Sequence, residues 1–117
     1  MDENEQLWHG RLLKCFDAAR TWETRITTPD EVEAGSSLAS DDKGLATAPV
    51  RGAAWAGLVS AVDHLALMAD LAKDELNMRP TSLFTPTRAA LLGASQAVWV
   101  LTGDRPTRRA RALAIRR

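Results

Sequence analysis

The chain has 117 residues, of which 45% are hydrophobic, and its 15 basic and 15 acidic side chains give a net charge of zero. This length is typical of one domain and allows a hydrophobic core without metals or disulfides. The only cysteine, Cys15, excludes an internal disulfide and favours a reducing, cytoplasmic compartment. We expect no membrane-spanning stretch, and the acidic residues 1–5 are unlike a signal peptide.

Charge is distributed unevenly along the chain. Residues 1–42 carry ten acidic and four basic side chains, whereas residues 105–117 carry six arginines and no acid. The two ends can therefore attract each other, within one molecule or between copies. A basic end can also bind a polyanion such as nucleic acid.

The first predicted element is a helix over residues 3–27. Its apolar residues recur at alternating steps of three and four, which places them on one helical face. They are Trp8, Leu12, Cys15, Ala19, Trp22 and Ile26. Residues 28–48, rich in Gly, Ser and Asp, are predicted to form a long flexible loop, within which a short helix at 30–34 is compatible with the composition.

The longest helical pattern runs over residues 49–78, with Thr47 as the expected N-cap and Pro49 in the first turn. Such a helix would be about 45 Å long and would give the shorter segments a surface to pack on. Its expected packing stripe is Trp55, Leu58, Val62, Leu65, Ala69, Ala72 and Leu76.

A third helix is predicted over residues 86–102, after an expected cap at Thr85, with Leu91, Leu92, Val98, Trp99 and Leu101 as its apolar set. A strip of small residues, Ala90, Gly93, Ala94 and Ala97, would let another helix approach closely. Asp104 is expected to cap a short basic helix over residues 105–117. We therefore predict a single all-α domain over residues 1–117, a bundle of three long helices and a short C-terminal helix. The chain ends within this last helix, as a fragment or a truncated relative would.

No motif for catalysis, a cofactor or a metal is evident. The chain has no Gly-x-Ser-x-Gly, no Glu-x-x-His and no Cys/His cluster, and with two histidines a zinc site is not expected. Asp63 and His64 are neighbours on a helix and point about 100° apart, so they do not form a dyad. We expect His64 to be a half-buried structural residue, His9 to be exposed and Cys15 to lie in the core.

Two sets of residues are candidates for binding. Trp8, Trp22, Trp55 and Trp99 either fill one core or act as anchors at a protein interface, a role for which tryptophan is enriched. The basic end could bind nucleic acid, or it could pair with the acidic N-terminal region. It consists of Arg105, Arg108, Arg109, Arg111, Arg116 and Arg117.

Three stretches carry a resemblance to known proteins: Asp-His-Leu-Ala-Leu-Met at 63–68, Thr-Pro-Thr-Arg-Ala-Ala-Leu-Leu-Gly-Ala-Ser at 85–95, and Val-Trp-Val-Leu-Thr-Gly-Asp-Arg at 98–105. This half of the chain resembles uncharacterised helical proteins of actinobacteria and their phages, some of which are similar to the HEPN superfamily of RNA-cleaving toxins. The HEPN signature needs an Arg that is followed by a His after four to six intervening residues. Here the nearest Arg before His64 is Arg51, so the resemblance does not imply RNase activity.

The function predicted from the sequence is therefore non-enzymatic. We expect a helical module that binds another protein or a second copy of itself, with regulation or host interaction as the setting that the resemblance implies. The alternative is a nucleic-acid-binding or RNA-associated protein that uses the arginine helix. No cofactor and no membrane partner are expected.

Overall fold

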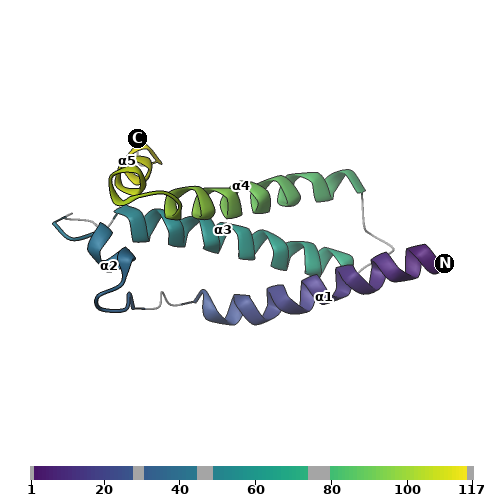
Figure 1. Ribbon diagram of the computed structural model, residues 1–117. Helices are drawn as coiled ribbons and strands as arrows, with labels where there is room; N and C mark the ends of the chain where they lie inside the picture. Colours follow the sequence, from purple (N-terminus) through teal and green to yellow (C-terminus); the bar gives the residue numbers. More distant parts are fainter. Residues whose placement is uncertain (1, 28–30, 45–48, 74–79, 116–117) are drawn as a thin grey trace.

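The computed structural model describes residues 2–27, 31–44, 49–73 and 80–115. Helices α1 (Glu3–Arg25), α3 (Pro49–Ala72) and α4 (Phe84–Leu101) run side by side, each antiparallel to the next (Figure 1). The short α2 (Ser37–Asp41) and the C-terminal α5 (Arg105–Ile115) lie at one end, and a 3₁₀ turn, η1 (Pro80–Leu83), leads into α4. All regular elements in these residues are helical, which confirms the all-α prediction.

Helix α3 is the middle of the three long helices, with α4 packed along one side and α1 along the other. The result is an open, elongated layer measuring 56 × 27 × 24 Å. Its radius of gyration is 17.3 Å, whereas a compact domain of this length would have about 13 Å. One face of α3 is therefore left uncovered between its two neighbours.

The contact between α3 and α4 is close because glycines meet at the crossing. A Cβ atom on Gly57 would lie 2.5 Å from the Gly93 carbonyl oxygen, and one on Gly93 would lie 2.6 Å from the Gly57 carbonyl oxygen. Both distances are to backbone atoms, which cannot move aside as a side chain can. The predicted close approach at Gly93 is thus confirmed, and Ala90 is buried beside it; Ala94 from the same predicted strip is exposed.

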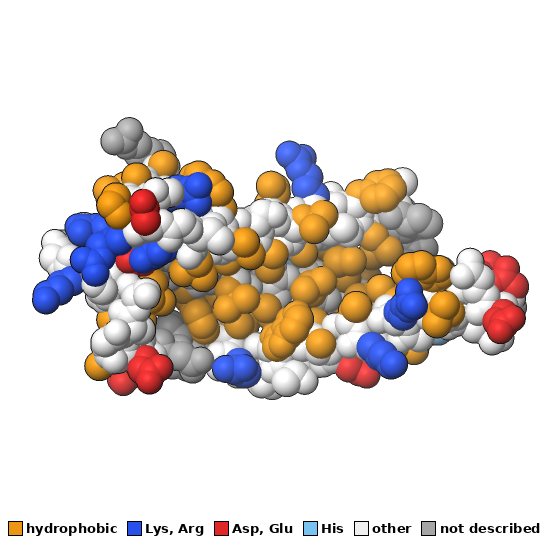
Figure 2. All heavy atoms as spheres, in the orientation of Figure 1, with side chains coloured by type: hydrophobic (Ala, Val, Ile, Leu, Met, Phe, Trp, Pro, Cys, Tyr) orange, Lys and Arg blue, Asp and Glu red, His pale blue; other side chains and the backbone are white. Residues whose placement is uncertain are grey.

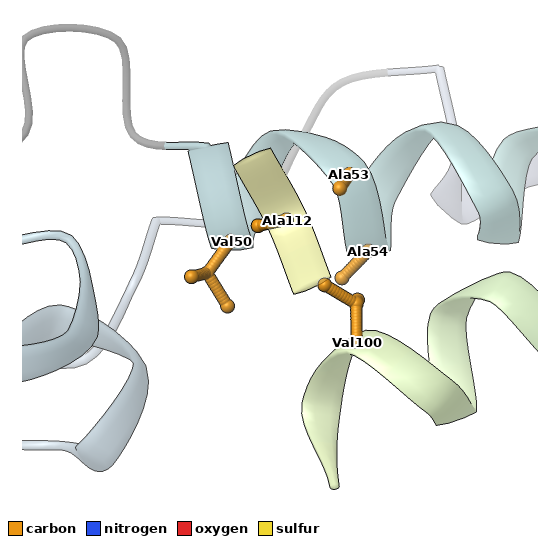
Figure 3. Close-up of a cluster of buried hydrophobic side chains, with 5 residues drawn as sticks. All are labelled: Val50, Ala53, Ala54, Val100 and Ala112. Carbon is orange, nitrogen blue, oxygen red and sulfur yellow. The ribbon is translucent and has the colours of Figure 1, made fainter. Parts of the chain in front are cut away.

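A small core joins α3, α4 and α5 at the end near α2. It consists of Val50, Ala53, Ala54, Val100 and Ala112 (Figure 3), with Leu38 and Ile115 packed against it. None of the five central side chains is larger than valine, so the helices come close together but bury little apolar area per residue.

Two adjacent aspartates attach α2 to the rest of the structure. The Asp42 carboxylate accepts hydrogen bonds from the Val50 and Arg51 amides, at 3.1 and 3.3 Å, and so caps the first turn of α3. Asp41 is only 1% exposed and forms a two-point ion pair with Arg108 of α5. The segment that the sequence suggested as a flexible loop therefore includes a helix at Ser37–Asp41, a few residues after the suggested position.

Several predicted boundaries and caps can be compared with the structure. Helix α1 is capped by Asp2 in a reciprocal arrangement with Glu5, and the predicted Asp104 cap of α5 is confirmed by a 2.9 Å bond from the Thr107 amide. The Thr85 prediction is wrong, because α4 already begins at Phe84, directly after η1. The expected Thr47 cap and the last predicted turn of the central helix, residues 74–78, lie outside the described residues.

Helix α3 bears on the expectation that no stretch resembles a membrane span. Its 24 residues include an 18-residue window with a mean hydropathy of 1.3, of which 39% is buried inside the molecule. It is thus long and apolar enough to cross a bilayer by length and composition alone. The central helix of a water-soluble bundle has the same properties, and α3 is the central helix here.

Candidate functional site

An apolar groove follows the uncovered face of α3. It consists of two adjoining hollows of about 290 and 450 Å³, which share Trp55 and Leu58. Its floor and walls come from all three long helices, namely Trp22, Trp55, Leu58, Val62, Ala97 and Leu101. Figure 2 shows hydrophobic side chains gathered over this part of the molecule, with a hollow between α1 and α4. We refer to these six residues as the groove.

The first half of α1 forms a second apolar surface. Arg20 pairs with Asp70 near the end of α3, and the N-terminal part of α1 extends past the last turn of that helix (Figure 1). The predicted stripe of α1 is buried only where α3 lies beside it: Ala19 is fully buried, whereas Trp8 and Leu12 are 59% and 46% exposed. We call residues 3–15 the arm. Its stripe continues the packing face of α1 but is exposed at Trp8 and Leu12. Within the arm, the Arg11 guanidinium lies 4.9 Å from the Trp8 ring centre.

The four tryptophans do not fill one core. Trp8, Trp22 and Trp99 are 59%, 46% and 45% exposed, and Trp55 is half-buried in the groove. The groove brings Trp22 and Trp55 together, while Trp8 lies on the arm. Trp99 is instead held by α5, since the Arg111 guanidinium stacks 5.1 Å from its ring centre.

Most of the described arginines of α5 have partners inside the molecule. Arg108 binds Asp41, and this hydrogen bonding raises the pKa of its guanidinium. Arg105 donates to Ser40, and Arg111 donates to the carbonyl oxygens of Trp99 and Thr102 at the end of α4. Arg109 has no hydrogen bond or ion pair with the described residues, and Arg116 and Arg117 lie outside them. Three of the six predicted phosphate ligands are thus engaged within the molecule. Arg108 and, at 3.9 Å, Arg105 pair with the Asp41 carboxylate, whereas Arg111 pairs with backbone carbonyl oxygens.

No catalytic or metal-binding arrangement is found among the described residues. Their His, Cys, Asp and Glu side chains form no group that could hold a metal ion. His64 is half-buried as predicted, with Nδ1 2.6 Å from the Ser60 carbonyl oxygen. The prediction that Cys15 lies in the core is wrong: it is exposed, because it belongs to the arm.

The sequence analysis also misjudged the large apolar side chains of α4. Leu91, Leu92 and Val98, expected to pack inward, are each at least 60% exposed, since the small side chains face α3. Leu58 and Leu101 were expected in the core but line the open groove. The sequence did contain a signal, because α4 is apolar on both sides of its small-residue strip. That is more apolar surface than packing against one neighbouring helix requires.

Comparison with protein-family models, curated proteins and solved structures gives no match to this chain.

Proposed function

We propose that this chain is a non-enzymatic helical module whose function is to bind protein through its open apolar face, and that it does so by self-association. The observation that supports this most strongly is the amount of apolar surface without a partner. Long amphipathic helices of a folded monomer normally cover one another's apolar faces. Here, within the described part of the chain, a groove and an arm on neighbouring elements both remain exposed.

The area can be compared with that of ordinary monomers. The accessible surface is 8381 Å², whereas a folded monomer of 12.7 kDa is expected to expose about 6,200 Å². The excess is about 2,100 Å² per chain. This excess counts polar and apolar atoms together, and it is of the size that protein–protein interfaces bury.

Residue types in the groove agree with a binding role. Trp22, Trp55 and Leu58 line the same hollow, and tryptophan is among the residues most enriched at positions that dominate binding energy. The polar side chains at its edges are Arg25 and Arg51 together with Glu31 and Glu33, which suits a rim around an apolar centre. A cytoplasmic location and the absence of a cofactor stay predictions.

The test is the dependence of molar mass on concentration, measured by light scattering after size exclusion for the wild type, Trp22→Ala and His64→Ala. We expect Trp22→Ala to raise the dissociation constant at least about tenfold. His64→Ala should leave it within about twofold, because His64 does not line the groove. Equal masses for all three proteins at every concentration would contradict the proposal.

A further inference from the structure

We infer that the partner of the groove is a second copy of this chain, and that the arm of each protomer occupies the groove of the other in an antiparallel two-fold dimer. This inference rests on the proposed self-association and adds to it which surfaces meet. The inference rests on the two exposed apolar surfaces, because the arm is the convex side of a helix and the groove is a hollow of a size to receive one.

The dimensions of the two surfaces agree. The stripe of the arm from Trp8 to Cys15 spans seven residues, or about 10 Å of helix axis. On α3 the two hollows are lined from Arg51 to Val62, eleven residues or about 16 Å, so the groove is long enough for the whole stripe. A helix seated in the larger hollow would contact residues 31–38, α3 and α4 of its partner at once. Docking of an amphipathic helix into an apolar groove is a recurring mode of recognition.

Symmetry determines the orientation. The arm extends from one end of the molecule, and the larger hollow lies toward the opposite end, near α2 and α5 (Figure 1). A two-fold axis perpendicular to the long helices exchanges the ends, so it places each arm over the other chain's larger hollow. Both contacts form simultaneously, as an isologous interface requires.

Charge favours the same orientation. Acidic side chains cluster at the tip of the arm, and arginines cluster at the α2–α5 end (Figure 2). The tip carries Asp2, Glu3 and Glu5, and Arg51 lies at the rim of the larger hollow. Glu31 and Glu33 line the same hollow and outnumber Arg51 there, so the lining itself does not attract the tip. The attraction comes from the arginines of the α2–α5 end, and the apolar contact carries the affinity.

The experiment is complementation between two variants that are each defective in one surface. Leu12→Asp places a charge on the arm, and Leu58→Asp places one in the groove; Leu12 and Leu58 are 46% and 43% exposed, so both chains should fold. Leu92→Asp, at a position of α4 that is 60% exposed and lines neither hollow, is the matched control. Sedimentation velocity at matched concentrations gives the mass, and far-UV circular dichroism checks the folding.

We expect Leu12→Asp and Leu58→Asp each to be monomeric at concentrations where the wild type and Leu92→Asp are dimers. An equimolar mixture should recover a dimer, because the intact arm of the groove variant can occupy the intact groove of the arm variant. This heterodimer retains one of two contacts, so it should need on the order of a hundredfold more protein than the wild type. If Leu58→Asp does not fold, Leu101→Asp tests the same groove.

Two results would overturn the inference and leave self-association standing. A fully dimeric groove variant beside a monomeric arm variant would mean that the arms pair with each other. Two monomeric variants that give no dimer on mixing, at concentrations more than a hundredfold above those the wild type needs, would exclude an arm-to-groove contact. A wild type that is monomeric at all concentrations would instead overturn the proposed function and this inference together.

Discussion

The glycine crossing of α3 and α4 gives a sharp prediction, because two glycine-to-alanine substitutions on the same chain should have opposite signs. At Gly57 an added Cβ would lie 2.5 Å from the Gly93 carbonyl oxygen and 3.1 Å from the Ala97 amide nitrogen. At Gly52, one turn and a half earlier on α3, nothing lies within 4 Å. The two positions share a helix and differ in what faces them.

The expected magnitudes follow from those distances. Replacing glycine by alanine inside a helix stabilises it by about 0.8–1 kcal/mol when the methyl group has room, so Gly52→Ala should be more stable than the wild type. At Gly57 the helices must separate by several tenths of an ångström or more, and overpacking of this kind costs about 1–3 kcal/mol. Gly57→Ala should therefore lose stability despite its better helix propensity.

The assay is urea unfolding followed by circular dichroism at 222 nm, at one fixed protein concentration, because association would change apparent stability. Gly10→Ala, in α1 with nothing within 4 Å, is a second control and should behave as Gly52→Ala does. A Gly57→Ala protein as stable as these two controls would refute the close crossing of α3 and α4.

Three further predictions concern the attachment of α5 and the alternative function. Asp41→Ala should speed amide hydrogen exchange in α5 at least about tenfold, because the Arg108 guanidinium loses its two-point partner. The control Glu33→Ala, at an exposed position before α2, should not change the exchange rates, and equal rates in the two variants would contradict the role of the ion pair. Hydrogen bonds from the hydroxyl and amide of Thr107 lower the pKa of Asp104, so its contribution to stability is complete above about pH 4 and is lost as the pH falls through the lowered value. Asp104→Asn should abolish this part of the acid sensitivity of α5, measured by hydrogen exchange between pH 5 and 2. Single-stranded and duplex oligonucleotides should bind with dissociation constants no lower than about 10⁻⁴ M at physiological salt, measured by fluorescence anisotropy, because Arg105, Arg108 and Arg111 are engaged internally. Tight, steeply salt-dependent binding that is lost in Arg109→Ala would restore the nucleic-acid alternative.

Local features of the fold could be predicted from the sequence because local chemistry decides them. The periodicity placed α1 within two residues of its observed end, and the Asp104 cap follows from a side chain that bonds an amide three residues away. Gly93 could be identified as a close-approach position because a helix without a Cβ there has a flat side.

Features that depend on distant parts of the chain could not be predicted. The spacing of an apolar stripe in the sequence is the same whether or not a neighbouring helix covers it. In the structure, Arg20 pairs with Asp70 near the end of α3, and Trp8 and Leu12, earlier on α1, are exposed. Asp41 and Asp42 have polar neighbours in sequence and read as loop residues. Their partners, on α5 and at the start of α3, are brought close only by the fold.

The most direct test of the central claim is the molar mass of the wild-type protein in solution, measured by light scattering over a hundredfold range of concentration at low and high salt. Self-association through an apolar face predicts a mass of twice the 12.7 kDa chain at high concentration, with little loss of dimer when salt is added. A mass of one chain throughout would contradict it, and a dimer that exists only at low salt would place the contact in the charged ends instead of the groove.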